Sequence, residues 1–144
     1  MEEALALAAD AAQQGEVPVA AIITTAEGEV VARAANRVER DGDPTAHAEI
    51  LAIRAAAARL GSPRLEGCDL WVTLEPCPMC AGAIAHARIK RLYYGAEDPK
   101  SGGVSHGPRV FNQTTCHHQP EVYSGISGDK AGQMLTSFFQ GKRG

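Results

Sequence analysis

Segments typical of strands alternate with segments typical of helices along most of this chain, and this order restricts the fold more than any other feature. Apolar residues at three- and four-residue spacing predict the helices, and β-branched runs predict the strands. The predicted elements, in chain order, are a helix (2–14), a hairpin (17–25 and 29–34), a helix closed by Gly61, a strand (69–73), a helix (77–87), a strand (89–94), a long loop (97–119), a short strand near Val122 and a final helix (129–140). Later strands joined by helical crossovers run parallel, so we expect a layered α/β fold.

The length and composition of the chain narrow the class of protein. A chain of 144 residues suits one domain with its own core, so we expect a single domain over 1–144. The first residues lack the basic and apolar regions of a secretory signal, and no apolar run approaches the roughly 18 residues of a membrane span. We therefore expect a cytoplasmic protein without a membrane partner. The net charge of -3 gives no global attraction to nucleic acid, so any such contact is local.

Two of the four cysteines, Cys77 and Cys80, lie three positions apart at the start of a predicted helix. Thiols at a helix N-terminus ionise readily, which suits either a redox dithiol or a pair of metal ligands. His47 stands at the start of the preceding helix, and helix N-termini gather at one edge of an open α/β sheet. The three side chains can therefore meet and hold zinc with a fourth position left for water, whose pKa zinc lowers toward 7.

Glu49 follows His47 by two positions. Residues at i and i+2 do not share a face of a regular helix, so both reach one site only if the helix begins close to His47. With that geometry, Glu49 is predicted to carry protons as general base and then acid without binding the metal. Taken singly, His47 is typical of a polar helix start and Glu49 of a solvated first turn. It is their combination with the cysteine pair that indicates catalysis.

The pattern His-x-Glu followed by Pro-Cys-x-x-Cys is a recognised signature of zinc nucleobase deaminases. Over nearly its whole length the chain resembles the bacterial tRNA-specific adenosine deaminases of the cytidine/deoxycytidylate deaminase superfamily. The matching stretches are 16–19, 43–50, 64–68, 72–82, 94–100 and 137–139. The resemblance implies a three-layer α/β/α cytidine deaminase-like fold with a mostly parallel five-stranded sheet. It also implies a homodimer with one zinc ion per subunit, which converts the wobble adenosine of a tRNA anticodon loop to inosine and releases ammonia.

The resemblance further implies a set of substrate contacts. Asn36 matches the residue that hydrogen-bonds the target base, and the backbone of Ala48 assists it. Asp98 and Lys100 match a loop that borders the RNA, and Phe138 matches an aromatic residue near the anticodon. From the sequence alone, Asn36 is more typical of a turn or strand end, Asp98 of a turn before Pro99 and Phe138 of a core.

The chain departs from the family at three places, which affect substrate identity more than reaction type. Ala20 stands where the family often has glycine, and the segments 102–108 and 116–118 differ from better-known members. One alternative function is therefore a zinc deaminase of a free base or nucleoside, such as guanine, cytosine or cytidine. A second is a glutaredoxin-like redox protein. A third is a non-catalytic RNA-binding zinc module in which Cys116 or His117 closes the site.

Overall fold

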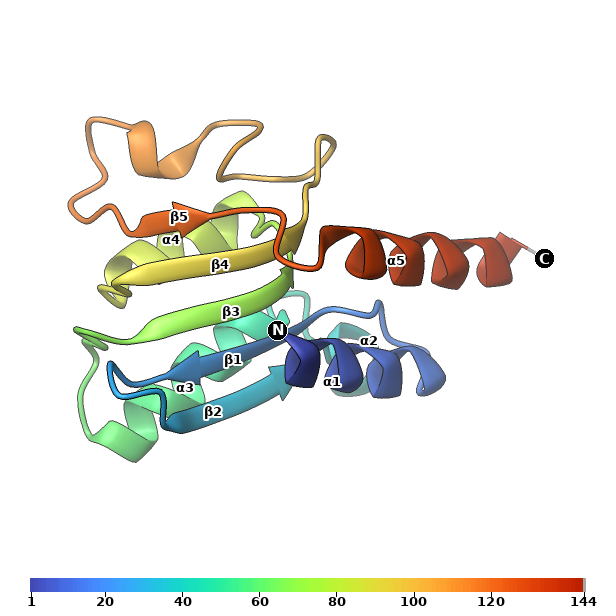
Figure 1. The fold of residues 1–144 in the computed structure, drawn as a ribbon, viewed down its shortest axis with the longest axis horizontal. Helices are drawn as coiled ribbons and strands as arrows, with labels where there is room; N and C mark the ends of the chain where they lie inside the picture. Colours follow the sequence, from blue (N-terminus) through green and yellow to red (C-terminus); the bar gives the residue numbers. More distant parts are fainter. Residues whose placement is uncertain (144) are drawn as a thin grey trace.

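Residues 1–143, which the computed structural model describes, form a five-stranded sheet between two layers of helices (Figure 1). The last residue of the predicted domain, Gly144, lies outside the described residues. The elements are α1 (Glu2–Gln13), β1 (Ala20–Thr24), β2 (Val30–Ala35), α2 (Val38–Asp41), α3 (Ala48–Leu60), β3 (Asp69–Leu74), α4 (Pro78–His86), β4 (Arg91–Ala96), the 3-10 helix η1 (Val110–Asn112), β5 (Glu121–Tyr123) and α5 (Gly128–Arg143). None of the helices described is long and apolar enough to cross a bilayer.

The sheet has the strand order β2-β1-β3-β4-β5. The pair β3–β4 is parallel, as the helical crossover through α4 predicts, and β4–β5 is also parallel although the segment between these strands contains only the short η1. β1 runs antiparallel to both β2 and β3, because the hairpin turns the chain back and β3 then pairs with the other side of β1. The predicted α/β class is confirmed, with the detail that the sheet is mixed: β1 runs against the other strands.

Helices cover both faces of the sheet. α1 and α5 pack on one face, and α3 and α4 pack on the other (Figure 1). Small residues on α3, among them Ala48, Ala52 and Ala56, are fully buried and let the helix lie close to the strands. Between the layers, large apolar side chains such as Ile84 and Leu92 are excluded from water. Burial of each stabilises the fold by about 1.5–3 kcal/mol.

α3 and α4 each begin at a residue that the neighbouring sequence determines. His47 is the N-cap of α3 and Cys77 the N-cap of α4, and both have extended backbone. Pro78 is the first residue of α4, a position where its fixed φ favours the helix and its missing N–H leaves no donor unpaired. α3 ends at Gly61, whose φ of 67° is the left-handed conformation that glycine adopts most easily. As a result, the chemically important side chains stand at the first turns of two buried helices.

Two short elements lie where the sequence predicts loop. α2 follows β2, and η1 lies inside the long segment 97–119. Neither is long enough to show an apolar period. β1 begins at Ala20, later than predicted, because the preceding Pro18 has no N–H to donate to a neighbouring strand.

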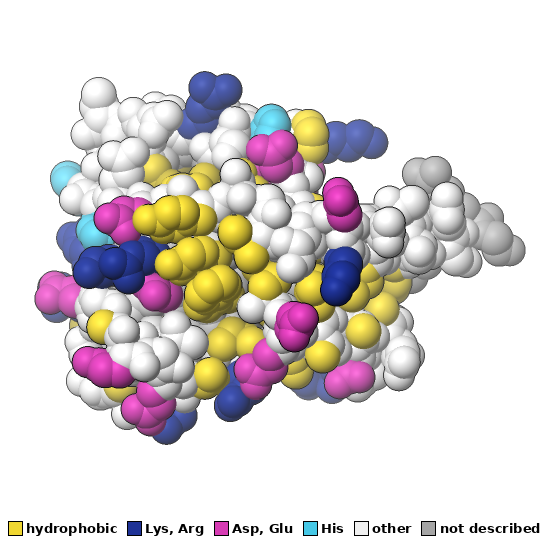
Figure 2. All heavy atoms as spheres, in the orientation of Figure 1, with side chains coloured by type: hydrophobic (Ala, Val, Ile, Leu, Met, Phe, Trp, Pro, Cys, Tyr) yellow, Lys and Arg dark blue, Asp and Glu magenta, His cyan; other side chains and the backbone are white. Residues whose placement is uncertain are grey.

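Part of the sheet face that carries α1 and α5 is left uncovered. Trp71, Tyr93 and Tyr123 stand side by side on β3, β4 and β5, with ring centroids 3.9 Å and 5.0 Å apart. Figure 2 shows the hydrophobic side chains gathered over this part of the sheet. We refer to these three residues as the aromatic row.

Replacement of Gly95 by alanine is expected to lower the free energy of unfolding by about 1–3 kcal/mol, because overpacking strains a filled core. A Cβ atom at this position of β4 would lie 2.6 Å from the Thr73 carbonyl oxygen and 3.1 Å from Ala131 Cβ on α5. Urea unfolding measures the change. Gly132→Ala is the control: apart from the backbone of its own helix, no atom of the described residues lies within 4 Å of a Cβ there, so it should leave stability equal or raise it. Equal stability of Gly95→Ala and the native protein would contradict the prediction.

Candidate active site

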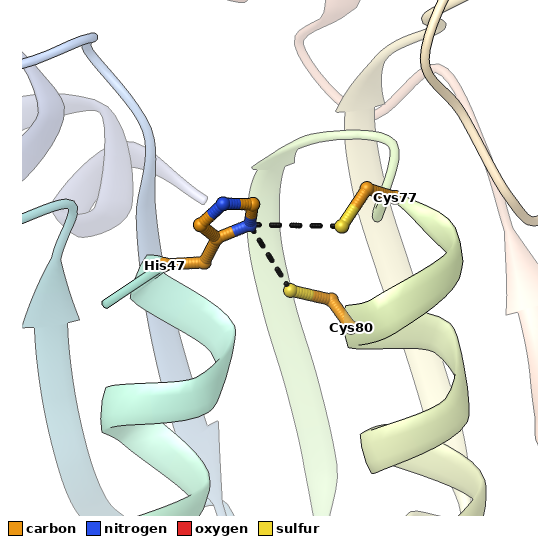
Figure 3. A group of neighbouring side chains, drawn as sticks. All are labelled: His47, Cys77 and Cys80. Atoms are coloured by element: carbon orange, nitrogen blue, oxygen red, sulfur yellow. Dashed lines mark hydrogen bonds between the residues drawn. The ribbon is translucent and has the colours of Figure 1, made fainter. Parts of the chain in front are cut away.

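The predicted metal-binding side chains lie together at the N-termini of α3 and α4 (Figure 3). The Nδ1 atom of His47 lies 3.4 Å from the Cys80 Sγ atom and 3.6 Å from the Cys77 Sγ atom. The three ligand atoms lie within 4.8 Å of one another, and within the described part of the chain no other His, Cys, Asp or Glu residues form such a group. The arrangement brings together residues that are 30 and 33 positions apart in the sequence.

The donor set and its spacing fit zinc. Zn–N and Zn–S bonds of the usual lengths, at tetrahedral angles, separate a nitrogen and a sulfur ligand by about 3.5 Å. The two observed distances from His47 to the cysteine sulfurs, 3.4 and 3.6 Å, bracket that value. Soft thiolates and imidazole are also donors that suit zinc. Three ligands from the protein are the number typical of a catalytic zinc site, whereas a structural zinc site has four.

The interaction between the two cysteine side chains shifts their pKa values in opposite directions. A hydrogen bond from the Cys80 side chain is the main reason that the pKa of Cys77 falls to about 4. The same hydrogen bond, followed by burial, raises the pKa of Cys80. A hydrogen bond with Cys77 also raises the pKa of His47. Coordination through both sulfurs therefore requires the Cys80 proton to leave, so we expect metal affinity to increase with pH.

Glu49 lies in the first turn of α3 and is 4% exposed. Because His47 has extended backbone just outside the helix, both side chains border the same cavity, although they are two positions apart. Burial raises the pKa of Glu49 to about 7, and the nearby Cys77 adds to this shift. A carboxyl group with a pKa near the working pH is well matched to proton transfer.

A cavity of about 280 Å³ opens above these residues. Its volume is just below the usual range for ligand pockets and suits a small flat ligand. The lining residues come from α2, the segments next to β1, β2 and β3, the helix starts and the loop that follows β4: Val17, Val19, Asn36, Val38, Glu39, His47, Ala48, Glu49, Leu74, Glu75, Cys77, Asp98 and Ser101.

The predicted substrate contacts divide into two groups. Asn36, Ala48 and Asp98 line the cavity beside the metal-binding residues. Lys100 and Phe138 are not part of its lining. Lys100 is exposed on the loop that follows β4, and Phe138 lies on α5 in edge contact with Phe139.

Sequence reasoning missed Glu75 and Glu16, two buried carboxylates outside the metal-binding group. Burial alone would raise the pKa of Glu75, but hydrogen bonds from Asp98, His106 and neighbouring backbone hold it below its usual value. The signal available in the sequence was the position of Glu75 directly before Pro76 and Cys77.

The segment Cys116-His117-His118 forms no second metal group with the other residues described. The Cys116 thiol donates to the His118 carbonyl oxygen at 3.1 Å, and the His118 ring lies 2.6 Å from the Ile89 carbonyl oxygen. The second of these contacts ties the loop to the residues just before β4. Neither Cys116 nor His117 lies with the three metal-binding residues, so a closed, non-catalytic zinc site is not formed by them.

The fold and the three-ligand site define a zinc-dependent deaminase. The model of the cytidine and deoxycytidylate deaminase zinc-binding region matches residues 1–96, and the chain belongs to this family. The family predicted from the motifs is therefore confirmed, and membership argues against the dithiol redox protein.

Among its relatives, the chain is 53% identical over 143 residues to the tRNA-specific adenosine deaminase of Agrobacterium fabrum, which covers 99% of this chain and 93% of that protein. It is also similar to a solved structure from studies of A-to-I editing by tRNA:A34 deaminases, with a TM-score of 0.91, 53% identity and coverage of 94% and 97% of the two chains. The guanine deaminase of Bacillus subtilis is less similar in structure: the TM-score is 0.63 and the identity 43%, over 67% of this chain and 61% of that one.

Proposed function

We propose that this chain hydrolytically deaminates the wobble adenosine of a tRNA anticodon loop, which gives inosine and ammonia. The observation that carries the proposal is the convergence of His47, Cys77, Cys80 and the buried Glu49 on one small cavity. Similarity over nearly the whole length to tRNA-specific adenosine deaminases supports tRNA as the substrate.

In this proposal His47, Cys77 and Cys80 hold zinc, which supplies Lewis acidity and makes a water molecule reactive near neutral pH. Glu49 accepts the proton of the attacking water and delivers it to N1 of adenine. It then takes the remaining proton from the hydroxyl group added at C6 and transfers it to the departing amine, so that one water is consumed and one ammonia released. The burial of Glu49 supports this role because it keeps the carboxyl group out of competing contact with bulk water.

The remaining lining residues position the base. Asn36 hydrogen-bonds the base edge and the Ala48 backbone assists, and Asp98 borders the mouth of the cavity. Lys100 and Phe138, outside the cavity, contact neighbouring parts of the RNA. A base in a single-stranded loop enters such a pocket most easily because little stacking has to be broken.

We further propose that the protein is a cytoplasmic homodimer with one zinc ion per subunit, in which residues 1–144 form a single domain. The support is the same family resemblance, together with the thiol ligands, which persist in a reducing compartment.

The test compares substrates with the zinc-loaded protein. An anticodon stem-loop with a wobble adenosine, free guanine, free cytosine and cytidine are incubated in parallel, and products are identified by mass spectrometry. We expect inosine in the stem-loop and negligible turnover of the small substrates. Xanthine, uracil or uridine without inosine would move the activity to a free base or nucleoside, the alternative that shares this zinc site.

A further inference from the structure

Two buried carboxylates have no part in the proposed reaction. Glu16 is 0% exposed and Glu75 is 2% exposed, and neither belongs to the metal-binding group. Glu16 precedes β1, and Glu75 lies between β3 and α4. Burial of a carboxylate is unfavourable unless hydrogen bonds replace its water, so the partners of each show why it is buried.

Glu75 is surrounded by backbone donors from one loop. Its Oε2 atom accepts three consecutive N–H groups and its Oε1 atom accepts a fourth, and the His106 ring lies 2.8 Å from Oε1. The four backbone donors are the N–H groups of Asp98 at 3.0 Å, Val104 at 3.2 Å, Ser105 at 2.9 Å and His106 at 3.1 Å. Inward-pointing N–H groups need an acceptor, so the loop 98–106 takes its shape from this one carboxylate.

The loop in turn forms part of the cavity. Asp98 and Ser101 line it. There is no room between the loop and the metal-binding segment: a Cβ atom on Gly102 would collide with the Glu75 carboxylate, and one on Gly103 would lie 2.6 Å from the Pro78 nitrogen. The N–H group of Gly103 also donates to the Pro76 carbonyl oxygen at 2.8 Å. These contacts hold the part of the loop that lines the cavity against the start of α4.

Glu16 holds a different segment in the same way. Its two carboxylate oxygens accept the N–H groups of Glu39 at 3.1 Å and Arg40 at 2.7 Å. These groups are in the first turn of α2, and the N-cap residue Arg37 makes no side-chain cap. Val38 and Glu39 line the cavity, so Glu16 fixes a second part of its lining.

We propose that Glu16 and Glu75 are positioning residues which set the shape of the substrate cavity by anchoring α2 and the loop 98–106 from inside the protein. As far as it concerns RNA binding, this inference rests on the proposed function. The carboxylates act through backbone groups and touch no reacting atom. Their effect should therefore be on substrate affinity more than on the chemical step.

Glu75→Gln tests the inference, because glutamine keeps the shape but turns an NH₂ group toward backbone donors. Hydrogen exchange followed by mass spectrometry on the zinc-loaded protein should show exchange about tenfold or more faster in peptides covering 98–106, and unchanged exchange in those covering α2. With the anticodon stem-loop, KM should rise about tenfold while kcat per bound zinc stays within about twofold.

Glu16→Gln should give the complementary result, with faster exchange in the peptides covering α2 and native exchange in 98–106. Glu27→Gln, at an exposed turn residue with no hydrogen-bond partner among the described contacts, is the matched control and should behave as the native protein. Native exchange in both anchored segments, or a uniform increase over all peptides, would overturn the inference. So would a fall in kcat at unchanged KM.

A second variant covers the case in which Glu75→Gln fails to fold. Gly102→Ala keeps the carboxylate and pushes the loop away from it, because its Cβ atom has no space beside Glu75. It should reproduce the local exchange and the raised KM. The exchange result needs no substrate, so it decides the inference even if the native protein makes no inosine. Absence of inosine from the native protein counts against the proposed function alone.

Discussion

Replacement of Glu49 by glutamine is expected to abolish inosine formation while zinc stays bound. Glutamine keeps the size and shape of the side chain, but it replaces one carboxyl oxygen by an NH₂ group and cannot carry a proton at neutral pH. Proton transfer by a positioned side chain contributes about 10²–10⁴-fold to rate, so turnover should fall by at least that range. Inosine in an anticodon stem-loop is quantified by mass spectrometry, and zinc per chain by elemental analysis of the same sample.

The zinc measurement separates two roles for Glu49. If the residue were a ligand, the variant would lose metal as well as activity. The control is Glu66→Gln, which removes one carboxylate from an exposed position and should keep both. Native activity in Glu49→Gln would remove the basis of the proposed mechanism, and loss of zinc would reassign the residue to the metal site.

Cys80→Ala is expected to remove zinc, abolish activity and lower the melting temperature. The Cys80 side chain is 0% exposed, and it supplies one of the three ligands that the described residues offer. A ligand that binds only the folded protein adds about 4 kcal/mol of stability at 1,000 times its Kd, and the variant should lose most of that gain. Zinc content and thermal melting of the purified variant measure the two effects together.

Chelation provides the matching control. Removal of zinc from the native protein should lower its melting temperature toward that of Cys80→Ala, while the variant should not respond to the chelator. Cys116→Ala removes a thiol that bonds only to its own loop, and it should keep native zinc content. A native zinc content in Cys80→Ala would show that the metal is held elsewhere.

The sequence predicted the metal-binding residues and Glu49 more completely than it predicted the segments that form the rest of the cavity. The metal-binding residues and Glu49 stand at helix starts, and helix starts have local signals such as Pro78 and the order of strand and helix. The condition that α3 must begin at His47 followed from spacing alone, and the structure meets it. These features depend on residues that are close in sequence.

What could not be predicted depends on buried residues far along the chain. α2 has no apolar period of its own, and its first turn is anchored by Glu16, 23 positions away from Glu39. The segment 97–119 is rich in turn residues, yet part of it is ordered by Glu75, 31 positions before His106. A carboxylate that accepts backbone N–H groups at such a distance leaves no periodic or compositional signal.

The aromatic row also gives the molecule an intrinsic optical reporter. Trp71 is the only tryptophan in the chain, and it stacks on Tyr93 on the sheet face that carries α1 and α5, outside the lining of the zinc-site cavity. Its emission therefore follows the integrity of the sheet and is insensitive to events confined to the cavity. Removal of zinc alone should consequently leave this emission unchanged, and the emission should change only when the sheet itself unfolds on heating.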